Sequence, residues 1–434
     1  MRVLFTVSAW PGHYFPMVPL ARSLGAAGHG VRVLCAPSQA DPVRAAGLSA
    51  VPVLDGLDMV LQARLRQFWD AQAGNWPYRW LPPHPVTGVE LRSLDEFDFP
   101  AYRQRHRAAA LEATRRSFDA AVAFARDWRP DLVVHDRLSI EGLLVGRVLD
   151  VPAALHLWGP VGTAEDGALR LLPGDPTGSF PRYGVGELSA DLIEHVVDPC
   201  PDAVRPPLRD AHRIPVRYVP YVPYDGTDAA ALEPPARPRV VVVWGTSLTA
   251  MVGPRSFVVP DILRALSTVD AEVVALVSPS DAVRLDAPAG VRLLPGYPLE
   301  RALDGASVVV HHGGAGCTMT ALGGGVPQVA VTFAGEQAAN GERVAAAGAG
   351  RHLPGAAFDA DAVAAAVADL LHDPRARRVA ADLRGQCLAR PAPADLVPAL
   401  ARLADPASGY SLAGSAPFAS AGPREDERRR RCGR

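Results

Sequence analysis

"VVVHHGGAGCTMTALGGGVPQVAVTFAGEQAAN", residues 308–340, is the most informative segment of this sequence. It begins with β-branched apolar residues, which are typical of a strand buried on both faces, and then runs through two histidines and three glycines into a helical pattern. In a doubly wound sheet, ligands bind beyond the carboxyl ends of the strands. Free amides at the start of the next helix bind phosphate, and an imidazole beside them adds a contact. The stretch therefore predicts a diphosphate site; a tight strand–helix turn is the alternative that the glycines alone leave open.

The whole chain repeats this strand–helix alternation in two halves, separated by a proline-rich segment. The alternation predicts an α/β fold with two Rossmann-like, doubly wound parallel-sheet domains. The irregular aromatic stretch at 68–80 predicts long loops and short helices. The expected order is an N-terminal domain, a linker, a C-terminal domain, a terminal helix that could cross back to the first domain, and a disordered tail ending in "REDERRRRCGR": residues 1–215, 216–238, 239–390, 391–407 and 408–434.

Composition narrows the classes of partner. Hydrophobic residues make up 48% of the chain and the net charge is -2, so no global field favours nucleic acid or an anionic membrane surface. Every cation is an arginine, which excludes lysine chemistry such as a Schiff base. The five cysteines are scattered without a CxxC pair, as suits a reducing cytosol. No apolar run is long enough for a signal peptide or a membrane span, so we expect a cytoplasmic protein.

Two motifs carry a resemblance to a known family. "HHGGAGCTMTALGGGVPQ" at 311–328 and "EQAANGERVAAAGAG" at 336–350 resemble the signature of family 1 glycosyltransferases of the GT-B fold. The chain looks most like the bacterial enzymes that attach deoxysugars to macrolides and other natural products, over about residues 1–405. The resemblance implies an enzyme of antibiotic biosynthesis that needs no cofactor. It would take a nucleotide-sugar donor in its C-terminal half and an apolar natural-product acceptor in its N-terminal half.

By this resemblance, His312 and the backbone at Gly316 would contact the donor diphosphate, while Glu336 and Gln337 would hold sugar hydroxyls. The implied donor-binding residues are Gly245, Thr246, Ser247, Tyr297, His312, Gly313, Gly314, Gly316, Cys317, Thr318, Glu336 and Gln337.

Three positions in this half bear on the donor. Cys317 stands where the family usually has Thr or Ser, and Glu336 where it usually has Asp. Thr320 stands where plant relatives place a Glu on the ribose diol. A neutral residue there fits a thymidine diphosphate donor, whose sugar lacks the 2′-hydroxyl.

The N-terminal half offers a base. His13 lies in the loop "WPGHYFP" after the first strand, and Asp136 ends the strand "DLVVHD". Imidazole suits proton abstraction near neutral pH, and a carboxylate can orient it. Taken alone, a structural loop histidine and a helix cap explain both residues; the resemblance makes them the catalytic pair of a single, inverting displacement. Trp76, Trp80 and Trp158 are the candidate acceptor-binding residues, although core packing explains the first two equally well.

Other readings remain open. The pair Asp359 and Asp361 has the form of a metal-binding DxD but precedes an alanine-rich helix, so helix capping is expected and no metal is predicted. Some similar enzymes need an activating partner protein, and a homodimer is also compatible with the sequence. The rivals are a catalytically silent scaffold that binds a sugar nucleotide or a partner, and a nucleotide-sugar epimerase or hydrolase.

Overall fold

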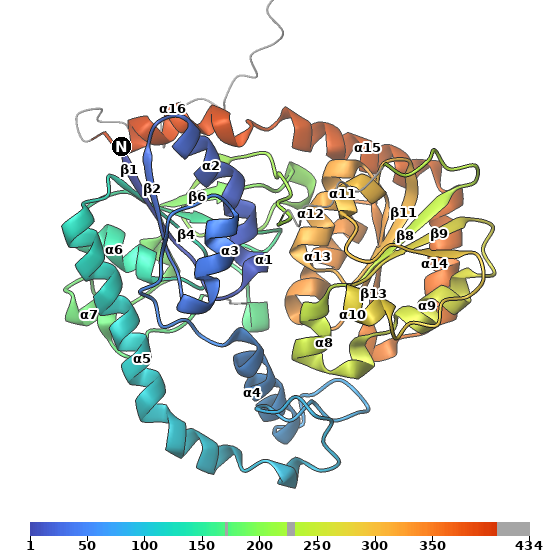
Figure 1. The fold of residues 1–434 in the computed structure, drawn as a ribbon, viewed down its shortest axis with the longest axis horizontal. Coiled ribbons are helices and arrows are strands. Elements are labelled where there is room, and N and C mark those ends of the chain that lie inside the picture. Colours follow the sequence, from blue (N-terminus) through green and yellow to red (C-terminus); the bar gives the residue numbers. More distant parts are fainter. Residues whose placement is uncertain (170–171, 224–230, 406–434) are drawn as a thin grey trace, which may run out of the picture.

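The computed structural model describes residues 1–169, 172–223 and 231–405. Two α/β domains lie side by side, each with a parallel sheet covered by helices on both faces (Figure 1). The predicted fold class is therefore confirmed. The predicted tail at 408–434 and the middle of the predicted linker, 224–230, lie outside the described residues.

The N-terminal domain contains a seven-stranded parallel sheet in the order β3-β2-β1-β4-β5-β6-β7. Its strands are β1 Arg2–Thr6, β2 Gly30–Leu34, β3 Ala50–Val51, β4 Leu132–His135, β5 Ala153–His156, β6 His195–Asp198 and β7 His212–Pro215. Its helices are α1 Pro11–Tyr14, α2 Val18–Ala26, α3 Ala40–Ala45, α4 Met59–Gln72, α5 Phe99–Trp128, α6 Glu141–Leu149 and α7 Ser179–Arg182.

The C-terminal domain contains a six-stranded parallel sheet in the order β10-β9-β8-β11-β12-β13. Its strands are β8 Arg239–Val243, β9 Glu272–Leu276, β10 Val291–Leu293, β11 Ala306–His311, β12 Gln328–Thr332 and β13 Gly350–Pro354. The helices that follow β8 are α8 Thr246–Val252, α9 Val259–Leu266, α10 Pro279–Ala282, α11 Leu299–Ala302, α12 Ala315–Gly324, α13 Gly335–Ala346, α14 Ala360–His372, α15 Pro374–Ala389 and α16 Pro393–Leu403.

The order of the strands positions the site. In the first sheet the winding direction reverses between β1 and β4, and in the second between β8 and β11. Ligands of doubly wound sheets bind in the crevice that such a reversal opens beyond the strand ends. The predicted catalytic residues follow β1 and β4, and the predicted diphosphate residues follow β8 and β11. Both sets therefore lie at switch points.

The chain returns to the first domain at its C-terminal end. Helix α15 packs on the C-terminal domain, whereas α16 places Leu396 and Leu400 in a core cluster with Val3 and Phe5 of β1 (Figure 1). Between the two helices, the Arg390 guanidinium donates to the backbone oxygen of Asp198 at 3.2 Å. The two domains are thus connected by the linker and, a second time, by the segment in which α15 on one domain is followed by α16 on the other.

A long excursion between β3 and α5 differs from the sequence expectation. Instead of loops and short helices throughout, it begins with the 14-residue helix α4. Asp58 caps that helix by accepting from the Leu61 amide, and Phe68 packs against Phe97 in a small core of its own. Between Asp58 and Phe68 the sequence is too polar to show the apolar spacing that is typical of a helix. The excursion reaches across to α8 of the other domain (Figure 1).

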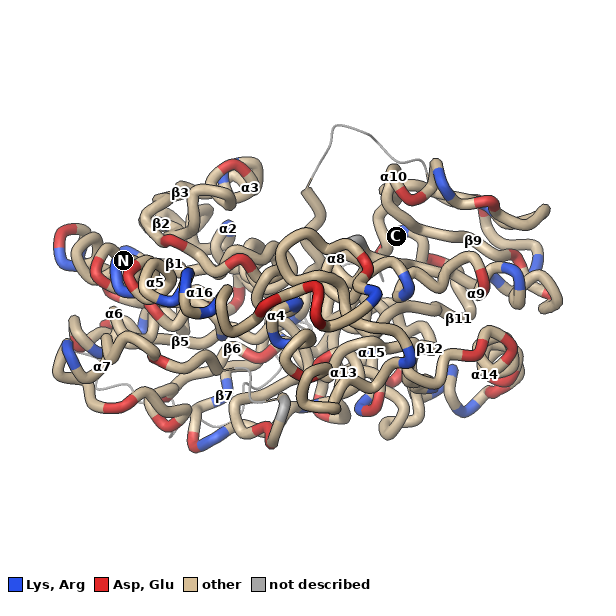
Figure 2. Tube along the Cα trace, turned by 90° about the horizontal axis from the view of Figure 1, so that it is seen from below, with Lys and Arg blue, Asp and Glu red and all other residues tan. Residues whose placement is uncertain are grey.

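Charged residues of both signs are interspersed over the two domains (Figure 2), in keeping with the near-zero net charge. Among the described residues, no helix is both long and apolar enough to cross a membrane.

Candidate active site

Ser8 stands between the two predicted catalytic residues. Its hydroxyl lies 3.3 Å from His13 Nδ1, and its backbone amide bonds to the Asp136 carboxylate. That carboxylate accepts the backbone amide of Ser8 at 2.6 Å through Oδ2, and the amides of Leu138 and Ser139 at 2.7 and 2.9 Å through Oδ1. The structure therefore brings His13 and Asp136 to one switch point, but a serine connects them.

The Ser8 contact bears on which nitrogen of His13 is free. With the proton on Nδ1, the ring donates to the Ser8 hydroxyl, and the lone pair lies on Nε2. Burial, and secondly the charge of Arg137, lower the pKa of His13 to about 3, so the imidazole is neutral. Burial raises the pKa of Asp136, against the effect of its hydrogen bonds. A neutral imidazole with a free Nε2 can accept a proton.

Trp158, which follows β5, joins this centre to the other domain. Its indole ring stacks on the His13 ring, with centroids 3.9 Å apart and an interplanar angle of 13°. Its Nε1–H donates to Glu336 Oε1 at 2.6 Å, and the Arg137 guanidinium lies 5.1 Å from the ring centroid. Glu336 is in the first turn of α13. The predicted base and the predicted sugar-binding carboxylate thus contact the same side chain.

On the C-terminal side, the two adjacent histidines have different surroundings. The His311 ring is fully paired: Nδ1 accepts the Gly313 amide at 3.0 Å, and Nε2 bonds to Gln328 at 2.8 Å. Asn340 donates to the Gly313 carbonyl, which holds the glycine turn from its other side. In contrast, Nδ1 of His312 is buried without a partner among the described residues. Burial and neighbouring His311 lower the pKa of His312 to about 3.

The start of α12 has the geometry that the predicted diphosphate site requires. Gly314 occupies the N-cap position with no side-chain cap, so the first-turn amides are available to a ligand. Thr318 Oγ1 is buried without a partner in the part of the chain described. Burial raises the pKa of the Cys317 thiol to about 12, which keeps it neutral. Gly245, the N-cap of α8, lies against the His312 ring, so the ends of β8 and β11 meet here.

The remaining predicted donor residues are placed as follows. Thr246 and Ser247 begin α8, and Tyr297 packs beside a cluster that includes Val309 of β11. Gln337 accepts the Phe333 amide at 2.9 Å through its side-chain oxygen. Thr320 donates to the Gly316 carbonyl at 2.7 Å within α12.

The aromatic excursion bridges the domains. Trp76, Tyr78 and Trp80 pack against the main core of the C-terminal domain. The Tyr78 hydroxyl donates to the Phe333 carbonyl at 2.8 Å, and its ring stacks on Trp80 at 4.5 Å. The indole of Trp76 donates to the Trp80 carbonyl. Both tryptophans therefore contact the donor domain in this structure, and their predicted role in acceptor binding stays a prediction.

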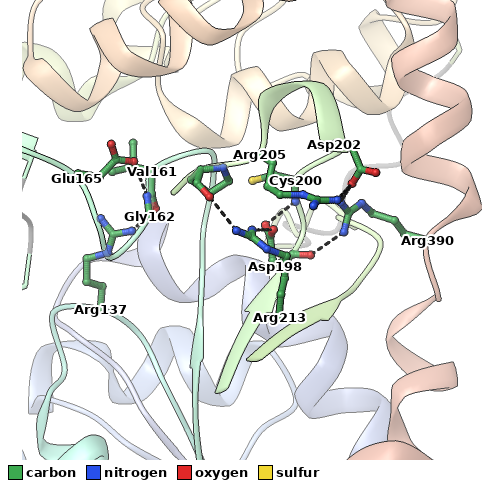
Figure 3. Close-up of polar contacts among 11 residues, drawn as sticks. Arg137, Val161, Gly162, Glu165, Asp198, Cys200, Asp202, Arg205, Arg213 and Arg390 are labelled. Atoms are coloured by element: carbon green, nitrogen blue, oxygen red, sulfur yellow. Dashed lines mark hydrogen bonds and ion pairs between the residues drawn. The ribbon is translucent and has the colours of Figure 1, made fainter. Parts of the chain in front are cut away.

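Several residues of the site were not identified from the sequence. Ser8 and Arg137 flank the predicted pair, and Arg343 of α13 forms a two-bond ion pair with Glu165 at 2.9 Å across the domain boundary. Figure 3 shows Arg137 reaching the loop at 161–165, where it donates to the Val161 carbonyl. Proximity in sequence could have suggested Ser8 and Arg137. The Glu165–Arg343 pair spans 178 residues and needs the fold.

The aspartates after β13 have a structural explanation. The Asp359 side chain accepts from the Asp361 amide at the start of α14, which confirms the predicted cap. Across the described ranges, no three His, Cys, Asp or Glu side chains group as ligands for a metal ion.

Comparison with known proteins gives the family. Residues 105–245 and 260–403 match the N- and C-terminal domain models of "Erythromycin biosynthesis protein CIII-like" proteins. The 10-deoxymethynolide desosaminyltransferase of Streptomyces venezuelae is 33% identical, over 93% of this chain and 97% of that protein. Among solved structures, spinosyn forosaminyltransferase SpnP is 29% identical, with a TM-score of 0.69 over 93% of this chain and 99% of that chain. Streptomyces sp. SF2575 glycosyltransferase SsfS6, solved with thymidine diphosphate, is 26% identical, with a TM-score of 0.67 over the same shares.

These matches span both domains and the site between them. The chain therefore belongs to the erythromycin CIII-like family of GT-B glycosyltransferases, the deoxysugar transferases of antibiotic biosynthesis.

Proposed function

We propose that this enzyme transfers a deoxysugar from a thymidine diphosphate donor to a hydroxyl, or another nucleophile, of an apolar natural-product acceptor, with inversion at the anomeric carbon. One observation carries the proposal: His13 of one domain and Glu336 of the other both contact the Trp158 indole. The proposed base and the carboxylate proposed to bind sugar hydroxyls therefore lie close together where the two domains meet.

The geometry suggests a role for each residue. His13 Nε2 takes the proton of the acceptor hydroxyl, while the Ser8 hydroxyl holds the imidazole by its other nitrogen and Asp136 holds Ser8 by its backbone amide. The acceptor oxygen then attacks the anomeric carbon from the face opposite the diphosphate, and the carbon–oxygen bond to the diphosphate breaks. A single displacement of this kind inverts configuration. The departing diphosphate meets the first-turn amides of α12 and His312.

The donor assignment has two supports. A related structure contains thymidine diphosphate, and Thr320 is a neutral residue at the position where plant relatives bind a ribose diol. Tests of the acceptor begin with 10-deoxymethynolide, the compound for which the Streptomyces venezuelae relative is named.

The test is calorimetric binding of thymidine diphosphate and uridine diphosphate to the native enzyme and to His312→Ala. We expect thymidine-selective binding that the substitution weakens by about tenfold or more, equivalent to about 1.4 kcal/mol. Equal binding of the two nucleotides would refute the donor assignment. The anomeric configuration of the product, read by NMR, tests inversion. Nucleotide binding without turnover, unchanged in His13→Ala, would instead support an auxiliary binding protein.

A further inference from the structure

The Trp158 side chain uses its edge and its face for different contacts. The residue is 3% exposed. The edge donates to Glu336 Oε1 at 2.6 Å, and the face carries the stacked His13 ring. Arg137 also packs on the ring, and its bond to the Val161 carbonyl fixes the guanidinium (Figure 3). One indole therefore holds groups from both halves of the site.

Glu336 is the member of this group that a donor would need. Burial raises its pKa, while the Trp158 bond and the Arg137 charge lower it. A carboxylate that accepts paired sugar hydroxyls uses both oxygens, as in other two-bond contacts of carboxylates. Here Oε1 already accepts the indole N–H at a short distance. A sugar hydroxyl directed at the lone pair of Oε1 that accepts the indole N–H would therefore compete with Trp158 for Glu336.

The stacked face has a separate consequence. A neutral imidazole 3.9 Å from an indole and nearly parallel to it has little freedom to rotate out of plane. The Ser8 contact at 3.3 Å constrains the Nδ1 edge of the same ring. Trp158 and Ser8 together fix the direction in which His13 Nε2 points.

From these contacts we propose that Trp158 is a positioning residue with two roles. In the donor-free enzyme its N–H occupies Glu336, and the donor sugar displaces it. Its ring face keeps His13 in the plane needed to deprotonate the acceptor. The inference rests on the proposed function, because it takes Glu336 as the ligand of the donor sugar.

The binding test compares native enzyme with Trp158→Phe, which keeps an aromatic face and removes the N–H. The probes are dTDP-glucose and thymidine diphosphate, titrated by calorimetry. We expect Trp158→Phe to bind dTDP-glucose about tenfold more tightly, because no indole competes for Glu336, and to bind thymidine diphosphate within about twofold of native. The control is Trp128→Phe at the end of α5, beside the start of β2 and away from the strand ends that form the site.

The readout for the ring face is the NMR spectrum of histidine-labelled protein. A proton over an indole face is shifted upfield, so the His13 signal, assigned by its loss in His13→Ala, should move downfield in Trp158→Leu. The same signal should shift more with dTDP-glucose than with thymidine diphosphate, because only the sugar reaches Glu336 and displaces the indole.

The outcomes separate the two proposals. Unchanged or weaker dTDP-glucose binding by Trp158→Phe overturns the competition between indole and sugar. An unmoved His13 signal in Trp158→Leu overturns the stacking role. Failure of native enzyme to bind either nucleotide overturns the donor assignment itself, and this inference with it.

Discussion

Asp136→Asn tests whether the carboxylate acts first as an anchor for the loops of the site. The native carboxylate accepts three backbone amides, from Ser8 through Oδ2 and from Leu138 and Ser139 through Oδ1. An asparagine can accept through only one oxygen. If that oxygen keeps the two amides of the 138–139 turn, its NH2 group faces the Ser8 amide, donor against donor, where the native distance is 2.6 Å.

The magnitude follows from that single lost bond. A buried donor left unsatisfied costs about 1–3 kcal/mol, so we take about 2 kcal/mol for local opening of the loop after β1. Hydrogen–deuterium exchange should then accelerate by roughly 30-fold for amides in the segments around 8 and 138–139, because each ~1.4 kcal/mol is tenfold. Exchange in the C-terminal sheet should stay unchanged, since those strands make no bond to Asp136.

Ser8→Ala is the matched control. It keeps the backbone amide that bonds Asp136 and removes only the hydroxyl that touches His13. We expect nearly native exchange but a transfer rate lower by about tenfold, the value of one neutral hydrogen bond. Native exchange rates in Asp136→Asn would refute the anchoring argument. A full rate in Ser8→Ala, beside an inactive Asp136→Asn, would refute the relay through serine.

Two further predictions concern the glycine run and pH. In Gly314→Ala the new Cβ would lie 2.5 Å from His312 Nε2, so thymidine diphosphate should bind about tenfold more weakly by calorimetry. Gly323→Ala, which has open space around it, should bind the nucleotide as the native enzyme does. Equal binding by the two variants would contradict the placement of His312. Desolvation lowers the pKa of five histidines to about 3 or 4, well below the ordinary value of 6.5: His13, His135, His156, His311 and His312. Their contribution to stability is present above pH 6.5 and is lost as pH falls toward the folded pKa values, because the unfolded chain binds protons that the folded chain excludes. For each imidazole, the free energy of unfolding falls by about 1.4 kcal/mol per pH unit in that window. Buried carboxyls with raised pKa values partly oppose this loss of stability. The thermal unfolding midpoint should drop between pH 7 and pH 5, and a rise would contradict the neutral assignment.

The strands and the two-domain order could be predicted because strands buried in a parallel sheet consist of unbroken runs of apolar residues. Those at 239–243 and 306–311 are of this kind. The strands β6 and β7 escaped prediction because "HVVD" and "HRIP" are four residues long and begin with histidine. Helix α4 was also missed, since its buried side is limited to Phe68.

The candidate site shows a similar division. Motifs locate His13, Asp136 and His312 because each follows a strand at a switch point. The connection through Ser8 depends on β1 and β4 pairing in the register that sets Thr6 beside His135. The contact between Trp158 and Glu336 depends on how two separate sheets face each other. The residues next to Trp158 and Glu336 in the sequence therefore do not predict this contact.

The low pKa of His13 bears on its proposed role as the base. Burial and the Arg137 charge hold the imidazole neutral in the donor-free enzyme. The negative charges of Glu336, Glu165 and Asp136 raise the pKa of Arg137, whereas burial lowers it. A bound donor adds negative charge at the start of α12, and this charge attracts a proton on His13 more strongly in the protein than it would in water. That attraction favours the imidazolium. The bound donor would therefore raise the basicity of His13, whereas in the empty site burial and the Arg137 charge keep the imidazole a weak base. On this argument, removal of the acceptor proton by His13 depends on the donor being in place.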